Sequence, residues 1–119
     1  MRSVKVERID SEIARELSLL IAYEVKDPRI ADAMITVTGV KTTKDLKYAK
    51  VFVSIMAEDK KSALKLLQSM AGFLRSELSA RIRARTVPEL TFALDESFEY
   101  GQKIEKILRD INASKKDEQ

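Results

Sequence analysis

The stretch from residue 47 to residue 56, KYAKVFVSIM, restricts the fold of this chain more than any other feature. Apolar and polar side chains alternate along it, which puts Ala49, Val51 and Val53 on one face and Lys50 on the other. A period of two is typical of a strand with one buried face. A single strand cannot cover its own apolar face, so the fold needs a sheet with helices over one side.

The rest of the sequence supplies the partners of this strand. Apolar residues spaced three and four apart predict helices, and β-branched or alternating runs predict further strands. In chain order we expect a helix over 4–26, strands over 34–41 and 47–56, a helical stretch over 59–86, a strand over 89–94 and a helix over 97–111. The last helix is expected to turn four apolar side chains toward the core: Ile104, Ile107, Leu108 and Ile111.

The helical stretch over 59–86 is interrupted by a glycine. Asp59 is a plausible N-cap, because its side chain can accept from the first free N–H groups. Gly72 lies in the middle, where glycine costs about 1 kcal/mol relative to alanine. We therefore expect two helices joined near residue 72.

Composition excludes several classes of function. The 119 residues include no cysteine and no histidine. This removes disulfides, zinc–thiolate sites, cysteine nucleophiles and the commonest general base. The glycines are too few and too far apart for a phosphate-binding loop. We expect no catalytic residues, no metal site, no cofactor and no enzyme activity.

Length and hydropathy suggest one domain away from membranes. No apolar run approaches the ~18 residues that a membrane helix needs, and the N-terminus lacks the apolar core of a secretion signal. We expect a cytoplasmic monomer with a domain over 1–112 and a charged, disordered tail over 113–119.

A basic run follows Gly72. Arg75, Arg81, Arg83 and Arg85 are opposed by one acid, Glu77, in a chain with a formal net charge of +3. Fixed guanidinium groups suit a nucleic-acid backbone, so these arginines are candidate RNA contacts. The alternative is a solvated face whose aliphatic stems lie on neighbouring residues.

A second basic group lies on the predicted hairpin. Lys47 and Lys50 are candidate RNA contacts, and Tyr48 and Phe52 share the face of Lys50. Aromatic rings interleaved with lysine on an open sheet could stack bases. The alternative, that the rings only cover the sheet or pack against the last helix, is stronger for Phe52 than for Tyr48.

The order of elements predicts an α+β fold with a three-stranded sheet covered by helices on one face. Helix, strand, strand, helix, helix, strand is the order of a type II KH domain, a module that clamps single-stranded RNA. A KH domain normally carries GxxG between its two middle helices, and this chain has no such motif. The order therefore favours a KH-like RNA binder with an altered clamp, followed by a C-terminal helix.

Five segments in the same order resemble the ribosome-binding factor A family, whose bacterial members assist maturation of the small ribosomal subunit. These segments are EVKDPRI at 24–30, VTGV at 37–40, DLKYAKVFVS at 45–54, GFLRSEL at 72–78 and RTVPELTF at 85–92.

The resemblance implies a type II KH-like fold in which a helix–kink–helix replaces the clamp. The family's kink reads Ala-x-Gly, and here the positions are Met70, Ala71 and Gly72. It also implies binding to the free small (30S) ribosomal subunit and its 16S rRNA, with roles in late maturation, rRNA precursor processing and growth in the cold. Other assembly factors are possible partners, and Arg29 is a further candidate RNA contact.

Two other functions remain open from the sequence. One is a stand-alone KH-like protein that binds other RNAs. The other is a protein-interaction module that uses an exposed strand edge or the apolar last helix.

Overall fold

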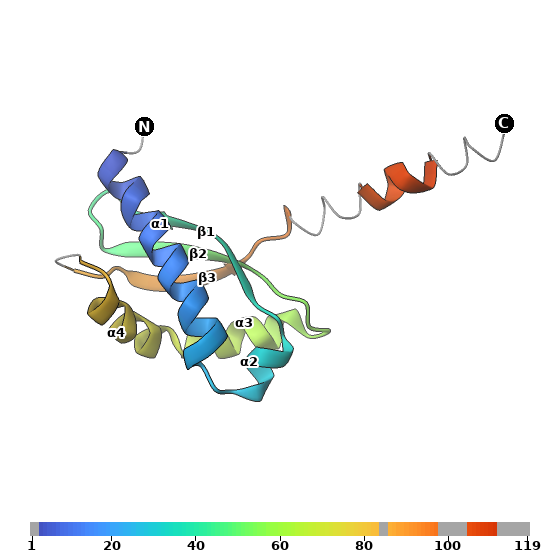
Figure 1. The fold of residues 1–119 in the computed structure, drawn as a ribbon, viewed down its shortest axis with the longest axis horizontal. Coiled ribbons are helices and arrows are strands. Elements are labelled where there is room, and N and C mark those ends of the chain that lie inside the picture. The colour runs from blue at the N-terminus through green and yellow to red at the C-terminus, as the bar shows by residue number, and fades with distance from the viewer. Residues whose placement is uncertain (1–2, 84–85, 98–104, 112–119) are drawn as a thin grey trace.

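The computed structural model describes residues 3–83, 86–97 and 105–111 of the chain (Figure 1). The order of elements agrees with the prediction, with one short helix added. The elements are α1 Val4–Leu19, the π-helical turn η1 Leu20–Glu24, α2 Pro28–Asp32, β1 Thr36–Thr42, β2 Tyr48–Ser54, α3 Lys60–Ser69, α4 Ala71–Arg81 and β3 Glu89–Leu94.

The three strands form one mixed sheet in the order β1-β2-β3. β1 and β2 are antiparallel, with Val40 opposite Val51, whereas β2 and β3 are parallel, with Val51 opposite Phe92. A parallel pair needs a long crossover connection. Here α3 and α4 provide it, which confirms the predicted α+β architecture.

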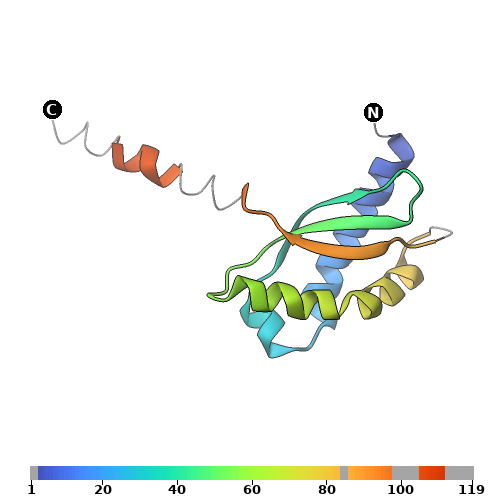
Figure 2. The same ribbon diagram turned by 180° about the vertical axis from the view of Figure 1, so that it is seen from behind.

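The core lies between one face of the sheet and the helices. Val51 and Val53 of β2 are fully buried, as the alternation predicted. They belong to the same buried cluster as Leu17 of α1, Leu67 of α3 and Leu74 of α4. All three long helices therefore cover one face of the sheet, and Figure 2 shows the opposite face without a helix over it. Exposed side chains such as Lys41 and Lys50 belong to that opposite face.

The first helix is shorter than its apolar pattern suggested. The Ser3 hydroxyl accepts a hydrogen bond from the Val6 N–H at 3.2 Å, and regular α-helix then continues to Leu19. A π-helical turn follows, closed by the bond from Val25 N–H to the Leu20 carbonyl. The short helix α2 was not predicted, because its five residues are too few to show a helical period.

The crossover consists of two helices, as predicted, but they meet at Met70. This residue caps the end of α3 and the start of α4 with φ −94° and ψ 2°. Gly72 is the second residue of α4, and its φ is not positive. The second helix ends at Arg81 rather than at residue 86.

The expected packing of the last helix is wrong in the described residues. Residues 105–111 are helical, but Ile107, Leu108 and Ile111 are exposed. The inner face of the sheet is already covered by α1, α3 and α4, which leaves no core position for these side chains. Ile104 and the predicted tail over 113–119 lie outside the described residues. None of the described helices has the length and apolar character to span a bilayer.

Candidate RNA-binding surface

A hollow of about 340 Å³ lies beside the first turns of α4. Its lining includes Gly72 and Arg75 of α4 and, from the segment before β3, Thr86 and Val87. In a KH domain the clamp between the two middle helices holds the RNA backbone. The hollow adjoins the corresponding junction of this fold, where α3 meets α4.

Arg75 is held in a fixed position at this hollow. Its Nε donates a hydrogen bond to the carbonyl oxygen of Val87 at 3.0 Å. Within the described residues no carboxylate pairs with its guanidinium. One of its five N–H donors is therefore used internally, and the two terminal nitrogens remain for an anion.

The other predicted arginines of this run have different surroundings. The guanidinium of Arg81 lies 3.8 Å from Glu16 and 3.6 Å from Glu24, so its charge is largely compensated. Arg83 is exposed and has no ion pair with any described residue. Arg85 lies outside the described residues.

Arg29 is also paired. Its Nε and Nη2 donate to the two carboxylate oxygens of Asp27 at 3.1 and 2.8 Å. These hydrogen bonds raise the pKa of Arg29 and lower the pKa of Asp27. Asp27 caps α2 at the same time, because it accepts from the Arg29 backbone N–H. Capping of α2 by Asp27 and the ion pair between Asp27 and Arg29 thus account for the residues of the DPRI segment without an RNA contact.

The two hairpin lysines lie in different places. The carbonyl oxygen of Lys47 accepts from the N–H of Glu89 at 2.9 Å, so Lys47 adjoins the start of β3. The β1–β2 turn and the segment after α4 lie at the same end of the molecule in both views (Figures 1 and 2). Lys50 lies further along, in the middle of β2 on the exposed face of the sheet.

The structure therefore divides the predicted residues. Arg75 and Arg83 lie toward one end of the sheet and α4 and form no ion pair with a described carboxylate. Lys47 lies toward the same end of the sheet beside Asp45, whose pKa is lowered by a hydrogen bond from the Thr43 hydroxyl, a hydrogen bond from the Lys47 backbone N–H and the charge of Lys47. The charges of Arg81 and Arg29 are compensated by Glu16 and Asp27, and the sequence alone did not identify these ion pairs.

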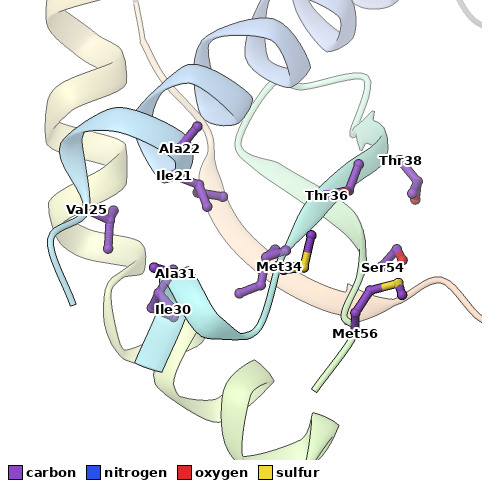
Figure 3. Close-up of a pocket in the computed structure, with 11 residues that line it drawn as sticks. Ile21, Ala22, Val25, Ile30, Ala31, Met34, Thr36, Thr38, Ser54 and Met56 are labelled. Atoms are coloured by element: carbon purple, nitrogen blue, oxygen red, sulfur yellow. The ribbon is translucent and has the colours of Figure 1, made fainter. Parts of the chain in front are cut away.

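An apolar groove of about 470 Å³ was not predicted (Figure 3). It lies between η1, α2 and the sheet, and its lining includes Ile21, Ile30, Met34 and Met56. Met34 is exposed and has a positive φ of 47°. The groove brings together four short segments, so no local pattern could have revealed it. Its lining has no charged side chain, which separates it from the basic surface.

The described residues contain no cluster of three or more side chains placed to hold a metal ion. Together, the mixed sheet, the crossover of two helices meeting at Met70 and the hollow beside α4 define a type II KH-like domain.

Comparison with known proteins gives the family. The family model of ribosome-binding factor A matches residues 5–108, and the chain belongs to this family. The ribosome-binding factor A of Caldanaerobacter subterraneus is 45% identical over 113 residues, which cover 93% of this chain and 92% of that protein.

Solved structures agree with this assignment. The crystal structure of ribosome-binding factor A from Thermus thermophilus superposes with a TM-score of 0.67 at 28% identity, covering 75% of this chain and 94% of that one. A homology model of the Thermus thermophilus factor, fitted into a cryo-electron-microscopy map of its complex with the 30S subunit, gives a TM-score of 0.59 at 25% identity, with coverages of 81% and 97%.

Proposed function

We propose that this protein binds the free small ribosomal subunit through its 16S rRNA and assists late maturation of that subunit. Membership of the ribosome-binding factor A family supports the proposal. The similarity to a factor that was fitted into a map of a 30S complex supports the choice of the small subunit. On this proposal the protein acts by binding, as a monomer and without a cofactor.

One observation carries the choice of surface. The guanidinium of Arg75 is fixed by the Val87 carbonyl at 3.0 Å, at the edge of the hollow beside α4. A fixed guanidinium recognises phosphate with a smaller loss of side-chain entropy than a free lysine does. Arg83 and Lys47 add exposed positive charge toward the same end. Phosphate contacts of this kind position a protein on RNA without reading its sequence.

The roles in rRNA precursor processing and in growth in the cold extend the same proposal, and they rest on the family resemblance. Depletion of the protein in its own host tests them. We expect unprocessed small-subunit rRNA and free small subunits to accumulate, with a larger effect at low temperature. Normal rRNA ends and a normal subunit profile at every temperature would contradict the proposal.

The alternative of a stand-alone RNA-binding protein predicts different bound RNAs. Cross-linking in cells followed by sequencing of the attached RNA separates the two functions. Small-subunit rRNA should dominate on our proposal, whereas messenger or regulatory RNAs should dominate on the alternative. A protein-interaction module predicts complexes whose affinity depends little on salt, because few counterions are released.

A further inference from the structure

The face of the sheet that points away from the helices forms a second surface. Along Tyr48–Val53 of β2 its side chains alternate with the buried ones, and in β1 the register shifts between Val37 and Gly39. No described helix covers this face (Figure 2). We call this surface the outer sheet face. Its residues are Gly39 and Lys41 of β1, Tyr48, Lys50 and Phe52 of β2, and Glu89, Thr91 and Ala93 of β3.

Two like charges lie opposite each other on the outer sheet face. Lys41 and Lys50 are direct partners in the antiparallel register, and both are exposed. Neither forms an ion pair with a described residue. Like charges in this register destabilise a sheet. Glu89, the acid of this face, is paired in register with Tyr48 at one end. The centre of the face therefore has an unbalanced positive charge that an anion would compensate.

Aromatic rings lie beside these lysines. Phe52 is half-buried, with the Lys50 Nζ 5.3 Å from the centre of its ring, and Tyr48 is 54% exposed. Phe52 is opposite Gly39 in the register, so one side of its ring has no neighbouring side chain across the strands. A Cβ placed on Gly39 would meet no atom within 4 Å, which shows that the space above this glycine is open.

We propose that the outer sheet face binds single-stranded RNA, with unpaired bases stacked on Phe52 and Tyr48 and phosphates near Lys41 and Lys50. Aromatic rings stack every base, and cations beside them hold the backbone. A duplex cannot stack its bases on these rings, because the bases are already stacked on one another, so the lysines alone would contact it. The inference rests on the proposed rRNA binding, and it adds a contact separate from the hollow at Arg75.

Two substitutions test this surface. Gly39→Val fills the open space beside Phe52; the position has no positive φ, and a β-branched residue suits a strand. Phe52→Leu removes the ring and keeps an apolar side chain. Thr36→Val is the matched control, because it introduces the same residue at the exposed first position of β1, opposite Ser54 rather than Phe52. Circular dichroism and thermal melts establish that each variant is folded.

The probe is a fluorescent oligouridylate of about 10 nucleotides, within the ~4–16 nucleotides that an OB fold, another sheet-based single-strand binder, covers. It is compared with a duplex RNA of equal length. Affinities are measured by anisotropy at one fixed salt concentration. We expect the parent to prefer the single strand. Phe52→Leu and Gly39→Val should each weaken single-strand binding by about 5- to 150-fold, the range that stacking of one base spans. Duplex binding and the Thr36→Val control should be unchanged.

Three results would overturn the inference: a parent that does not bind the single strand, unchanged affinity in a folded Gly39→Val variant, or an equal loss on the duplex. Sedimentation of the same proteins with small subunits distinguishes the two proposals. If the parent sediments with small subunits but the Phe52→Leu and Gly39→Val variants keep full oligonucleotide affinity, only the proposed RNA binding at the outer sheet face is contradicted. A parent that does not associate with small subunits contradicts the proposed function itself.

Discussion

The guanidinium of Arg81 lies 3.8 Å from a carboxylate oxygen of Glu16, which joins the end of α4 to α1. Glu24 of η1 approaches the same guanidinium at 3.6 Å. The side chain of Glu16 is only 16% exposed, so this pair is partly shielded from water. Arg81 therefore has a structural role that Arg83, two residues further on, does not share.

This difference predicts opposite effects of two neighbouring substitutions. Arg83→Gln should weaken binding to small-subunit rRNA and flatten its salt dependence, by about 0.7 in slope for each single-strand phosphate that the protein no longer neutralises. Arg81→Gln should change binding less but lower the free energy of unfolding, by about 1 kcal/mol or less for a pair that is partly exposed. Binding isotherms at several salt concentrations and urea titrations measure both effects. A larger loss of RNA affinity in Arg81→Gln would show that its pairing with Glu16 is broken on the RNA.

The fixed geometry of Arg75 gives a second prediction. Arg75→Lys keeps the charge but has no Nε–H to donate to the Val87 carbonyl and no planar pair of terminal nitrogens to present to a phosphate. We expect Arg75→Lys to lose RNA affinity and Arg75→Gln to lose more, with each variant destabilised by about 1 kcal/mol at most. Affinity at one salt concentration is the measurement. Full affinity in Arg75→Lys would mean that charge alone matters at this position.

Gly72→Ala should stabilise the protein. The glycine is inside α4, its φ is not positive, and a Cβ there would meet no atom within 4 Å. Alanine reduces the entropy of the unfolded chain, which is worth about 0.4–1 kcal/mol at a compatible position. The exposed Ala80 of the same helix offers the reverse control, since Ala80→Gly should destabilise by about 0.5–1 kcal/mol. A lower melting temperature for Gly72→Ala would show that the helix junction needs the freedom of a glycine.

Asp59 predicts a pH-dependent contribution to stability. It caps α3 by accepting from the Ser62 hydroxyl at 2.7 Å and from the Ser62 backbone N–H at 3.0 Å, and these bonds lower its pKa. Because the pKa of Asp59 is lower in the folded state, its carboxylate stabilises the fold fully above the unfolded-state pKa of about 3.9. This stabilisation is lost as the pH falls through the folded-state pKa.

The gap in stability between the parent and Asp59→Ala should therefore be full at neutral pH and shrink below pH ~4. Urea titrations at a series of pH values measure the gap. The neighbouring exposed Glu58 provides the control, because Glu58→Ala removes a carboxylate that does not cap α3. A gap that stays constant down to the lowest pH would show that the cap does not depend on the ionised carboxylate.

Residue spacing and residue type predicted those strands and helix ends that depend on interactions between neighbours in the sequence. The alternation around Val51 placed the buried face of β2, and the residue type of Asp59 identified a helix start that the structure confirms. The junction between α3 and α4 was predicted to within two residues. The prediction relied on the low helix propensity of Gly72, whereas the non-helical backbone angles occur at Met70.

Tertiary arrangement decided the rest. The charge of Arg81 is compensated because the fold brings Glu16 and Glu24 from the first helical segment against it. Ile107 is exposed, and other helices already cover the inner face of the sheet, which the spacing of apolar residues within one helix cannot show. The hollow at Arg75 depends on Val87 approaching α4, and the sequence identified its basic residue but not its shape.

The most direct test of the central claim is sedimentation of the protein with ribosomal particles from its own host. The lysate is resolved on a gradient that separates free small subunits, large subunits and complete ribosomes, and the protein is followed with a specific antibody. We predict that the protein migrates with free small subunits and is scarce on complete ribosomes, and that an Arg75→Gln, Arg83→Gln double variant shifts to the unbound fractions. Equal occupancy of free subunits and translating ribosomes, or a double variant that sediments like the parent, would contradict a maturation factor that binds through this surface.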